Sequence, residues 1–179
     1  LFSFFISCKV EPEEITIDLA ELTIADIHAA YMQGDYNSQD LVRAYIKAIE
    51  EVDEQINALT LINPEALSFA KALDVEYLET GEFRPLHGIP IVVKDNINTI
   101  GMPTTAGAFA LQDFIPAENA FIIDQLVEAG AILLAKSNMA EWAFSPMHSE
   151  SSTGGTTHNP YNLAYVPAGS SGGTAAAVA

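Results

Sequence analysis

Gly88–Asp95 reads G-I-P-I-V-V-K-D, and this stretch decides the fold class. It is apolar up to its last two residues, and a continuous run of β-branched residues is typical of a strand covered on both faces. A helical pattern at Glu118–Ala129 and a second apolar run at Ala131–Ala135 follow it. This strand–helix–strand order predicts an α/β architecture. The residues expected to face inward from the helix are Ile122, Ile123, Leu126 and Val127. A short helix is expected over residues 137–144.

The residues before this strand predict a helical layer with acidic outer faces. Ser38 and Asn63 are the expected N-caps of two of its helices, because short polar side chains accept the free N–H groups of a first turn. Pro64 is expected at the first helical position after Asn63. The predicted elements are helices at residues 23–32, 38–52 and 63–78, and a short strand at residues 58–62.

Charge excludes two classes of partner. Seven Lys and Arg against 24 Asp and Glu give a formal net charge of −17. Non-specific nucleic-acid binding needs clustered basic residues that neutralise phosphates, so no nucleic-acid partner is expected. An anionic membrane surface is disfavoured for the same reason. Beyond residue 85 the only Lys or Arg residues are Lys94 and Lys136, so each requires an explanation.

Lys94 ends an otherwise apolar strand. It could simply reach water, as strand-end lysines do. Burial would instead disfavour its charged form and lower its pKa towards neutrality, which would allow the amine to act as a general base. The neighbouring Asp95 would oppose this unless it points to the other face of the strand, which strand alternation allows.

A Gly/Ser turn, Gly169-Ser170-Ser171-Gly172-Gly173, leads into the helix-prone residues 174–179. Three interpretations compete. A phosphate loop would need a Lys before its final Ser or Thr, and there is none. A nucleophile elbow matches the pattern G-x-S-x-G with Ser171 at its centre, but it requires a preceding strand that Pro167 disfavours. A histidine-free serine relay requires a tuned base, for which Lys94 is the only candidate.

The polar stretch at residues 145–165 contains His148, Glu150 and His158. Their spacing matches no helical zinc pair such as H-E-x-x-H. We therefore expect these side chains to lie in a loop, and we expect neither a metal ion nor a cofactor. The length of the stretch still suggests a functional loop.

Five sequence blocks carry a resemblance. They are residues 88–96 around the lysine, M-P-T-T-A-G at 102–107, A-K-S-N-M-A-E-W-A at 135–143, N-P-Y at 159–161, and P-A-G-S-S-G-G at 167–173. Together they resemble the amidase-signature family of serine amidohydrolases, and they occur in the family's order from about residue 20 to the end of the chain. This resemblance implies part of an α/β/α layered fold with one mixed sheet.

The family's triad is a serine, a second serine on a cis peptide, and a lysine. By position, the resemblance implies that Lys94 is the general base and that Ser170 is the bridging serine on the cis peptide. The other residues to which the resemblance gives a role are Gly169 and Gly172 in close packing, Ser171 as a supporting hydrogen-bond partner, and Ala143 and Phe144 near the acyl side of the substrate pocket.

The resemblance implies hydrolysis of carboxylic amides to an acid and ammonia or an amine. The family's nucleophilic serine lies in a T-G-G-S-like segment that would follow Ala179, so the sequence is expected to be an inactive N-terminal part of a longer amidase. Two alternatives remain: a non-catalytic, membrane-tethered binding protein on the same fold, and the A-type subunit of a tRNA-dependent amidotransferase. Those subunits usually carry D-E-F-A where this chain has Glu141-Trp142-Ala143.

Phe5-Ile6-Ser7-Cys8 resembles a bacterial lipobox. We therefore expect residues 1–8 to be a signal-peptide remnant with Cys8 as a lipidation site, residues 9–19 a tether, and residues 20–179 the amidase part. The protein would then be anchored in the cell envelope and face the periplasm; otherwise it would be cytoplasmic. The alternative is an incidental cysteine. With one cysteine, no disulfide can form within the chain.

Overall fold

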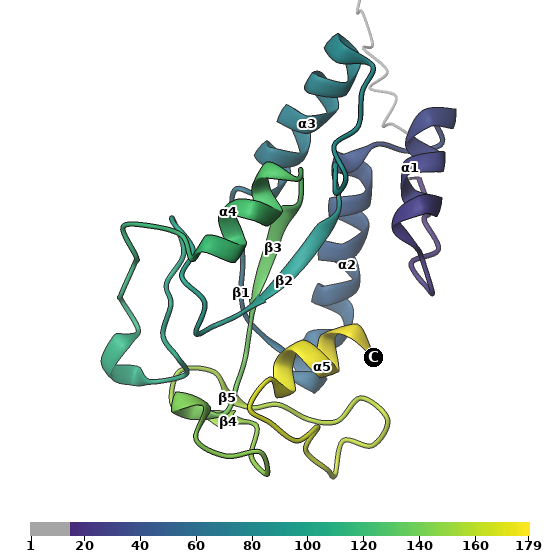
Figure 1. Ribbon diagram of the computed structural model, residues 1–179. Coiled ribbons are helices and arrows are strands. Elements are labelled where there is room, and N and C mark those ends of the chain that lie inside the picture. The colour runs from purple at the N-terminus through teal and green to yellow at the C-terminus, as the bar shows by residue number, and fades with distance from the viewer. Residues whose placement is uncertain (1–14) are drawn as a thin grey trace, which may run out of the picture.

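The computed structural model describes residues 15–179, and the proposed lipidation site Cys8 lies outside them (Figure 1). Three strands form the main sheet: β1 (Leu59–Ile62), β2 (Pro90–Lys94) and β3 (Ile132–Ser137). Their order is β1-β3-β2, with β2 parallel and β1 antiparallel to β3. The sheet is therefore mixed, as the resemblance implies, and all six residues of its central strand are buried.

The helices form layers on both faces of this sheet. Figure 1 shows α2 and α3 together on one face and α4 on the other. A small hairpin, β4 (Glu150–Ser151) with β5 (Gly155–Thr156), lies at the lower end. No helix within residues 15–179 is long and apolar enough to span a bilayer. The helices are α1 (Ile24–Gln33), α2 (Ser38–Ile56), α3 (Ala66–Thr80), α4 (Phe121–Glu128) and α5 (Gly172–Val178), with 3₁₀ turns η1 (Phe109–Leu111) and η2 (Glu141–Ala143).

The predicted starts of the first three helices lie within three residues of the observed ones, but the predicted caps differ. Asn37, not Ser38, caps α2, since its side chain accepts the Asp40 N–H at 3.0 Å and the Asp40 carboxylate accepts the Asn37 N–H in return. Ser38 is buried, and its N–H donates to Asp74 of α3 at 2.8 Å. The third helix starts at Ala66, so the proline after Asn63 lies in the turn before it.

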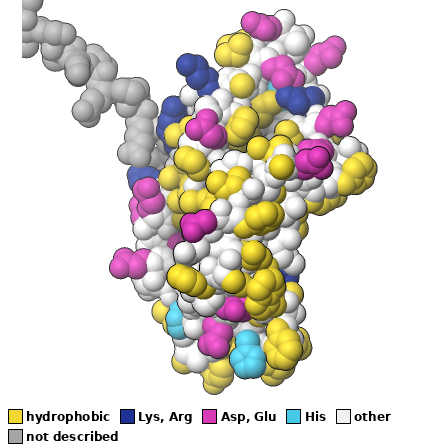
Figure 2. Space-filling model, turned by 90° about the vertical axis from the view of Figure 1, so that its left-hand side faces the viewer, with side chains coloured by type: hydrophobic (Ala, Val, Ile, Leu, Met, Phe, Trp, Pro, Cys, Tyr) yellow, Lys and Arg dark blue, Asp and Glu magenta, His cyan; other side chains and the backbone are white. Residues whose placement is uncertain are grey.

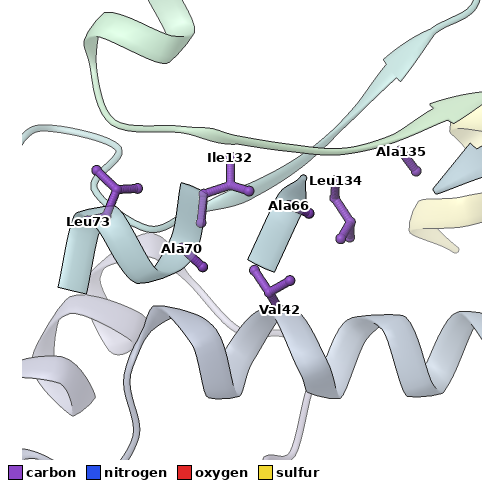
Figure 3. Packing of buried hydrophobic residues seen from close by; sticks show 7 residues of the cluster. All are labelled: Val42, Ala66, Ala70, Leu73, Ile132, Leu134 and Ala135. Atoms are coloured by element: carbon purple, nitrogen blue, oxygen red, sulfur yellow. The ribbon is translucent and has the colours of Figure 1, made fainter. Parts of the chain in front are cut away.

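The main core lies between β3 and the two long helices (Figure 3). Ile132 and Leu134 of β3 point from the sheet towards α2 and α3. Two alanines of α3, Ala66 and Ala70, are fully buried there, and their small side chains allow the helix to approach the sheet closely. Val42 of α2 completes the contact.

The second face of the sheet is covered by α4. Ile123 is buried there with Val93 and Leu133, and Leu126 is partly buried. The prediction that Ile122 and Val127 also face inward is wrong, because they are 54% and 40% exposed. A helix of eight residues against a sheet buries one narrow stripe, and the positions one residue away rotate outward. Figure 2 shows hydrophobic side chains over much of one face of the molecule, with acidic ones between them.

A bulge in the β2–β3 ladder changes which face of the sheet the later side chains of β3 point to. Ile91 pairs with Leu133, but the next residue, Val92, pairs with Ala135, so β3 carries one extra residue. Leu134 and Ala135 consequently both contribute to the core on the α2–α3 side. Such a bulge reverses the alternation of side chains beyond it.

His87 should make the stability pH-dependent. It is buried, its Nε2 lies 3.0 Å from the Leu73 carbonyl oxygen, and its Nδ1 has no partner. Burial lowers its pKa, so the unfolded state takes up the proton first as the pH falls. The contribution of His87 is complete above about pH 6.5 and declines below it, by at most about 1.4 kcal/mol per pH unit.

Denaturant unfolding of the full-length protein between pH 5 and 7.5 measures this slope. The His87→Gln variant, which does not titrate, is expected to show a shallower dependence than the wild type. Equal slopes for the two proteins would contradict this account of His87.

Candidate active site

The last residue of β2, Lys94, and the residue after it, Asp95, point to opposite faces of the sheet. Lys94 pairs in register with Ser137 of β3 and points towards the Gly/Ser turn before α5. Asp95 points the other way and is buried against Thr105. This confirms the separation that strand alternation predicts.

Lys94 contacts Ser170 directly. Its Nζ donates to Ser170 Oγ at 2.7 Å. Both residues are half-buried, and burial lowers the pKa of Lys94 below its ordinary value. A lysine amine that loses its proton more easily, in contact with a hydroxyl, is what a proton relay requires.

The turn that carries Ser170 is held by backbone contacts. The Gly169–Ser170 peptide is cis, as the resemblance implies. Ala140 N–H donates to the Ser170 carbonyl at 3.0 Å, and Gly169 N–H donates to the Pro146 carbonyl at 2.8 Å. Residues 166–168 form no strand, so the context that a nucleophile elbow requires is missing here.

The glycines of this turn leave no room for a side chain. A Cβ added at Gly169 would overlap the carbonyl oxygen of His148, and one at Gly172 would lie 2.8 Å from Ser149 Cβ. Both glycines are therefore closely packed against the preceding loop. Gly173 is confined most closely, because its added Cβ would overlap the carbonyl oxygens of both Ala58 and Asn138.

Asn138 joins this turn to the sheet and the hairpin. It is fully buried, its Nδ2 donates to the Gly155 carbonyl at 3.0 Å, and its carbonyl accepts the Gly173 N–H at 3.1 Å. Its Oδ1 accepts the Ser151 hydroxyl at 2.7 Å. The sequence predicts a short helix over residues 137–144, which is wrong, since β3 runs to residue 137 and only η2 forms a turn. In the sequence, the position of Asn138 directly after a buried strand is the feature that could have indicated this linking role.

A second lysine lies on the opposite face of the sheet from Lys94. Lys136 Nζ donates to the Ile97 carbonyl at 2.7 Å and to the hydroxyls of Thr99 and Thr104 at 3.2 and 3.0 Å. It lies 3.8 Å from a carboxylate oxygen of Asp95. Burial lowers the pKa of Lys136 to about 8, and the charge of Asp95 opposes that shift.

An open cavity of about 620 Å³ is lined in part by Ser145 and His148, whose carbonyl oxygens lie against Gly169, and by Phe144, which is 90% exposed. Neither Lys94 nor Ser170 lines it. Ala143 is in the neighbouring turn η2 and does not line the cavity. Ser171 is exposed, and its side chain does not cap α5. The full lining is Ala140, Glu141, Phe144, Ser145, His148, Glu150, Ser151, Ser152, Gly155 and Thr156.

The histidines of the polar stretch have local partners. His148 Nδ1 lies 2.8 Å from Ser145 Oγ, and His158 Nδ1 lies 3.0 Å from the Leu163 carbonyl oxygen. Within residues 15–179, no three His, Cys, Asp or Glu side chains are placed to hold a metal ion. The stretch instead forms the β4–β5 hairpin and part of the cavity wall.

Curated proteins of similar sequence include A-type subunits of glutamyl-tRNA(Gln) amidotransferase. The A-type subunit of glutamyl-tRNA(Gln) amidotransferase from Dehalococcoides mccartyi strain 195 is 45% identical over 163 residues, which are 90% of this chain and 33% of that protein. Its counterpart from Caldanaerobacter subterraneus is 40% identical over 164 residues, 91% of this chain and 33% of that protein. The chain thus spans about a third of the length of these relatives.

Solved structures agree in fold. The peptide amidase from Stenotrophomonas maltophilia superposes with a TM-score of 0.84 at 41% identity, covering 89% of this chain and 34% of that one. A bacterial aryl acylamidase of the amidase-signature enzymes gives a TM-score of 0.79 at 27% identity, covering 87% of this chain and 32% of that one. Residues 40–179 match the sequence profile of the amidase family, and the chain therefore belongs to that family.

Proposed function

We propose that the full-length protein hydrolyses carboxylic amides to an acid and ammonia or an amine. Lys94 and Ser170 would form two members of a Ser–cis-Ser–Lys relay. The observation that carries this proposal is the 2.7 Å hydrogen bond between the half-buried Lys94 amine and the Ser170 hydroxyl.

The relay would work as follows. Neutral Lys94 accepts the proton of Ser170, which in turn accepts the proton of a nucleophilic serine placed C-terminal to Ala179. That serine attacks the amide carbonyl, and the relay returns a proton to the nitrogen as the C–N bond breaks. Water then attacks the acyl ester, its proton enters the same relay, and the acid and the free serine are released.

The substrate class proposed is a small amide. The solved relatives are described as a peptide amidase and an aryl acylamidase, and both names denote amide substrates. The cavity beside the turn, with Phe144 on its wall, offers space for the acyl part of such a molecule. In the proposed mechanism, side chains of the protein carry out every proton transfer.

Release of ammonia from aliphatic and aromatic primary amides tests the proposal in the full-length protein. Ser170→Ala is expected to lower kcat/KM by about 10²–10⁴-fold, the range typical of a lost proton-transfer group. Ser68→Ala, on the exposed side of α3, is the matched control and should retain wild-type activity. A wild-type protein that releases no ammonia and is not labelled by a fluorophosphonate probe would contradict the proposal and favour the binding-protein alternative.

A second candidate is the A-type component of a glutamyl-tRNA(Gln) amidotransferase. It is favoured by the 45% identity to such a protein. Glu141-Trp142-Ala143 and the net charge of −17 favour the general amidase instead. Ammonia release that requires added partner subunits and glutamyl-tRNA would select this candidate, whereas turnover of small amides by the protein alone would select the first.

We also propose, from the sequence alone, a lipid anchor at Cys8 and a location in the cell envelope. Phe5-Ile6-Ser7-Cys8 is the pattern that supports it. Growth of the bacterial host with radiolabelled palmitate should label the wild-type protein and not Cys8→Ala. An unlabelled wild-type protein in the soluble fraction would contradict the anchor.

A further inference from the structure

A lysine that acts as a general base must lose its proton near the working pH. A carboxylate within a few ångströms stabilises the protonated amine and raises its pKa. The residue next to Lys94 is an aspartate, and neighbouring Cα atoms are only about 3.8 Å apart. The structure must therefore hold Asp95 so that its charge does not keep Lys94 protonated.

Asp95 is turned away and bound tightly on the other face of β2. Its carboxylate accepts the N–H of Thr105 at 3.3 Å and the hydroxyl of the same residue. Only 2% of its side chain is exposed. Thr105 thus provides two hydrogen-bond donors to this buried carboxylate.

Lys136 supplies the opposite charge. An ammonium group has three N–H donors, and the Nζ of Lys136 has three oxygen acceptors within 3.2 Å. Its side chain is 1% exposed and lies 3.8 Å from Asp95. This site therefore suits a lysine that stays protonated beside a carboxylate.

The elements packed around Lys94 bring no other buried charge. Strand β3 carries one charged residue, Lys136, while β1 and α5 carry none. Helix α4, on the far face, carries Asp124 and Glu128, and both are exposed. Helices α2 and α3 also pack against β2, and all of their charged residues are exposed or only partly buried. Among the described elements that pack against β2, Asp95 and Lys136 are thus the two buried charges that act on Lys94.

We propose that Lys136 is a positioning residue for the amidase reaction. Its ammonium neutralises Asp95 on the far face of β2, so the carboxylate next to Lys94 does not hold that lysine in its protonated form. This inference rests on the proposed function, because it assigns a role to Lys136 only if Lys94 is the base.

The pH dependence of kcat/KM in the full-length protein tests the proposal. Activity should rise with pH as Lys94 loses its proton. This rise is the acidic limb of the pH profile. Lys136→Met leaves the charge of Asp95 uncompensated, so the midpoint of the acidic limb is expected to move up by roughly one pH unit. Asp95→Asn leaves the charge of Lys136 uncompensated, so the limb should move down. The double variant has neither charge, and its limb should return to within about 0.3 unit of the wild type.

Lys71→Met is the matched control, because it makes the same chemical change on the exposed face of α3 and should leave the limb in place. If Lys136→Met does not fold, Asp95→Asn and the double variant carry the test. Limbs that coincide with the wild type in the folded variants, with only kcat reduced, would show a merely structural role and overturn the proposal. Failure of the proposed function itself would appear differently, as a wild-type protein without amide turnover.

Discussion

Replacing Lys94 with alanine in the full-length protein is expected to lower kcat/KM for amide hydrolysis by about 10²–10⁴-fold. The alanine removes the only amine in contact with Ser170 among the described residues. Without it, the bridging serine has no base to receive its proton, and the nucleophile stays a neutral alcohol. Initial rates of ammonia release at several substrate concentrations measure the change.

Two further variants make this result specific. Lys94→Arg keeps a positive charge but does not deprotonate near neutral pH, so it should be as inactive as the alanine variant. Combining Lys94→Ala with Ser170→Ala should cost little more than either change alone, since residues that act as one unit are not additive. Turnover within tenfold of wild type in Lys94→Ala would remove this residue from the mechanism.

Replacing Gly173 with alanine is expected to lower the free energy of unfolding by about 1–3 kcal/mol, the usual cost of overpacking. Helix propensity alone predicts the reverse, because Gly173 lies in α5 and alanine is favoured over glycine by about 1 kcal/mol in a helix interior. The added methyl group would overlap two backbone carbonyl oxygens, those of Ala58 and Asn138. Ala58 and Asn138 are both buried and lie at the ends of β1 and β3, so their backbone cannot easily move aside and packing should decide the sign.

Urea denaturation of the full-length protein measures this difference. Ala175→Gly, an exposed position of the same helix, is the control and should destabilise by about 1 kcal/mol through propensity. Both changes are therefore expected to lower the midpoint, although they exchange the same two residue types in opposite directions. A raised midpoint for Gly173→Ala would show that α5 does not pack as described.

The sequence predicts the elements whose pattern is long and repetitive. The apolar runs of β2 and β3 and the alternation that separates Lys94 from Asp95 are confirmed by the structure. These features depend on local periodicity, which neighbouring residues alone determine. The fold class and the contact between Lys94 and Ser170 were accessible for this reason and through the family resemblance.

The remaining features depend on contacts between distant segments. Asn37 caps α2 in place of Ser38, and the Ser38 N–H instead donates to Asp74, which lies 36 residues further along the chain. The predicted helix at residues 137–144 fails because Asn138 bonds to the hairpin and the Gly/Ser turn. The hydrogen-bond acceptors of the Lys136 amine come from the loop after β2, so the residues next to Lys136 in the sequence do not predict them.

The extra residue in β3 determines which way each lysine faces. Leu134 lies on the α2–α3 side, so strict alternation would place Lys136 there too. Because the ladder skips one position, Lys136 instead pairs with Val93 and meets Asp95, while Ser137 shares the face of Lys94. A strand of the same length without this bulge would pair Lys136 with Lys94 and bring a second cation to the proton relay. The bulge in β3 therefore keeps the two lysines on opposite faces of the sheet.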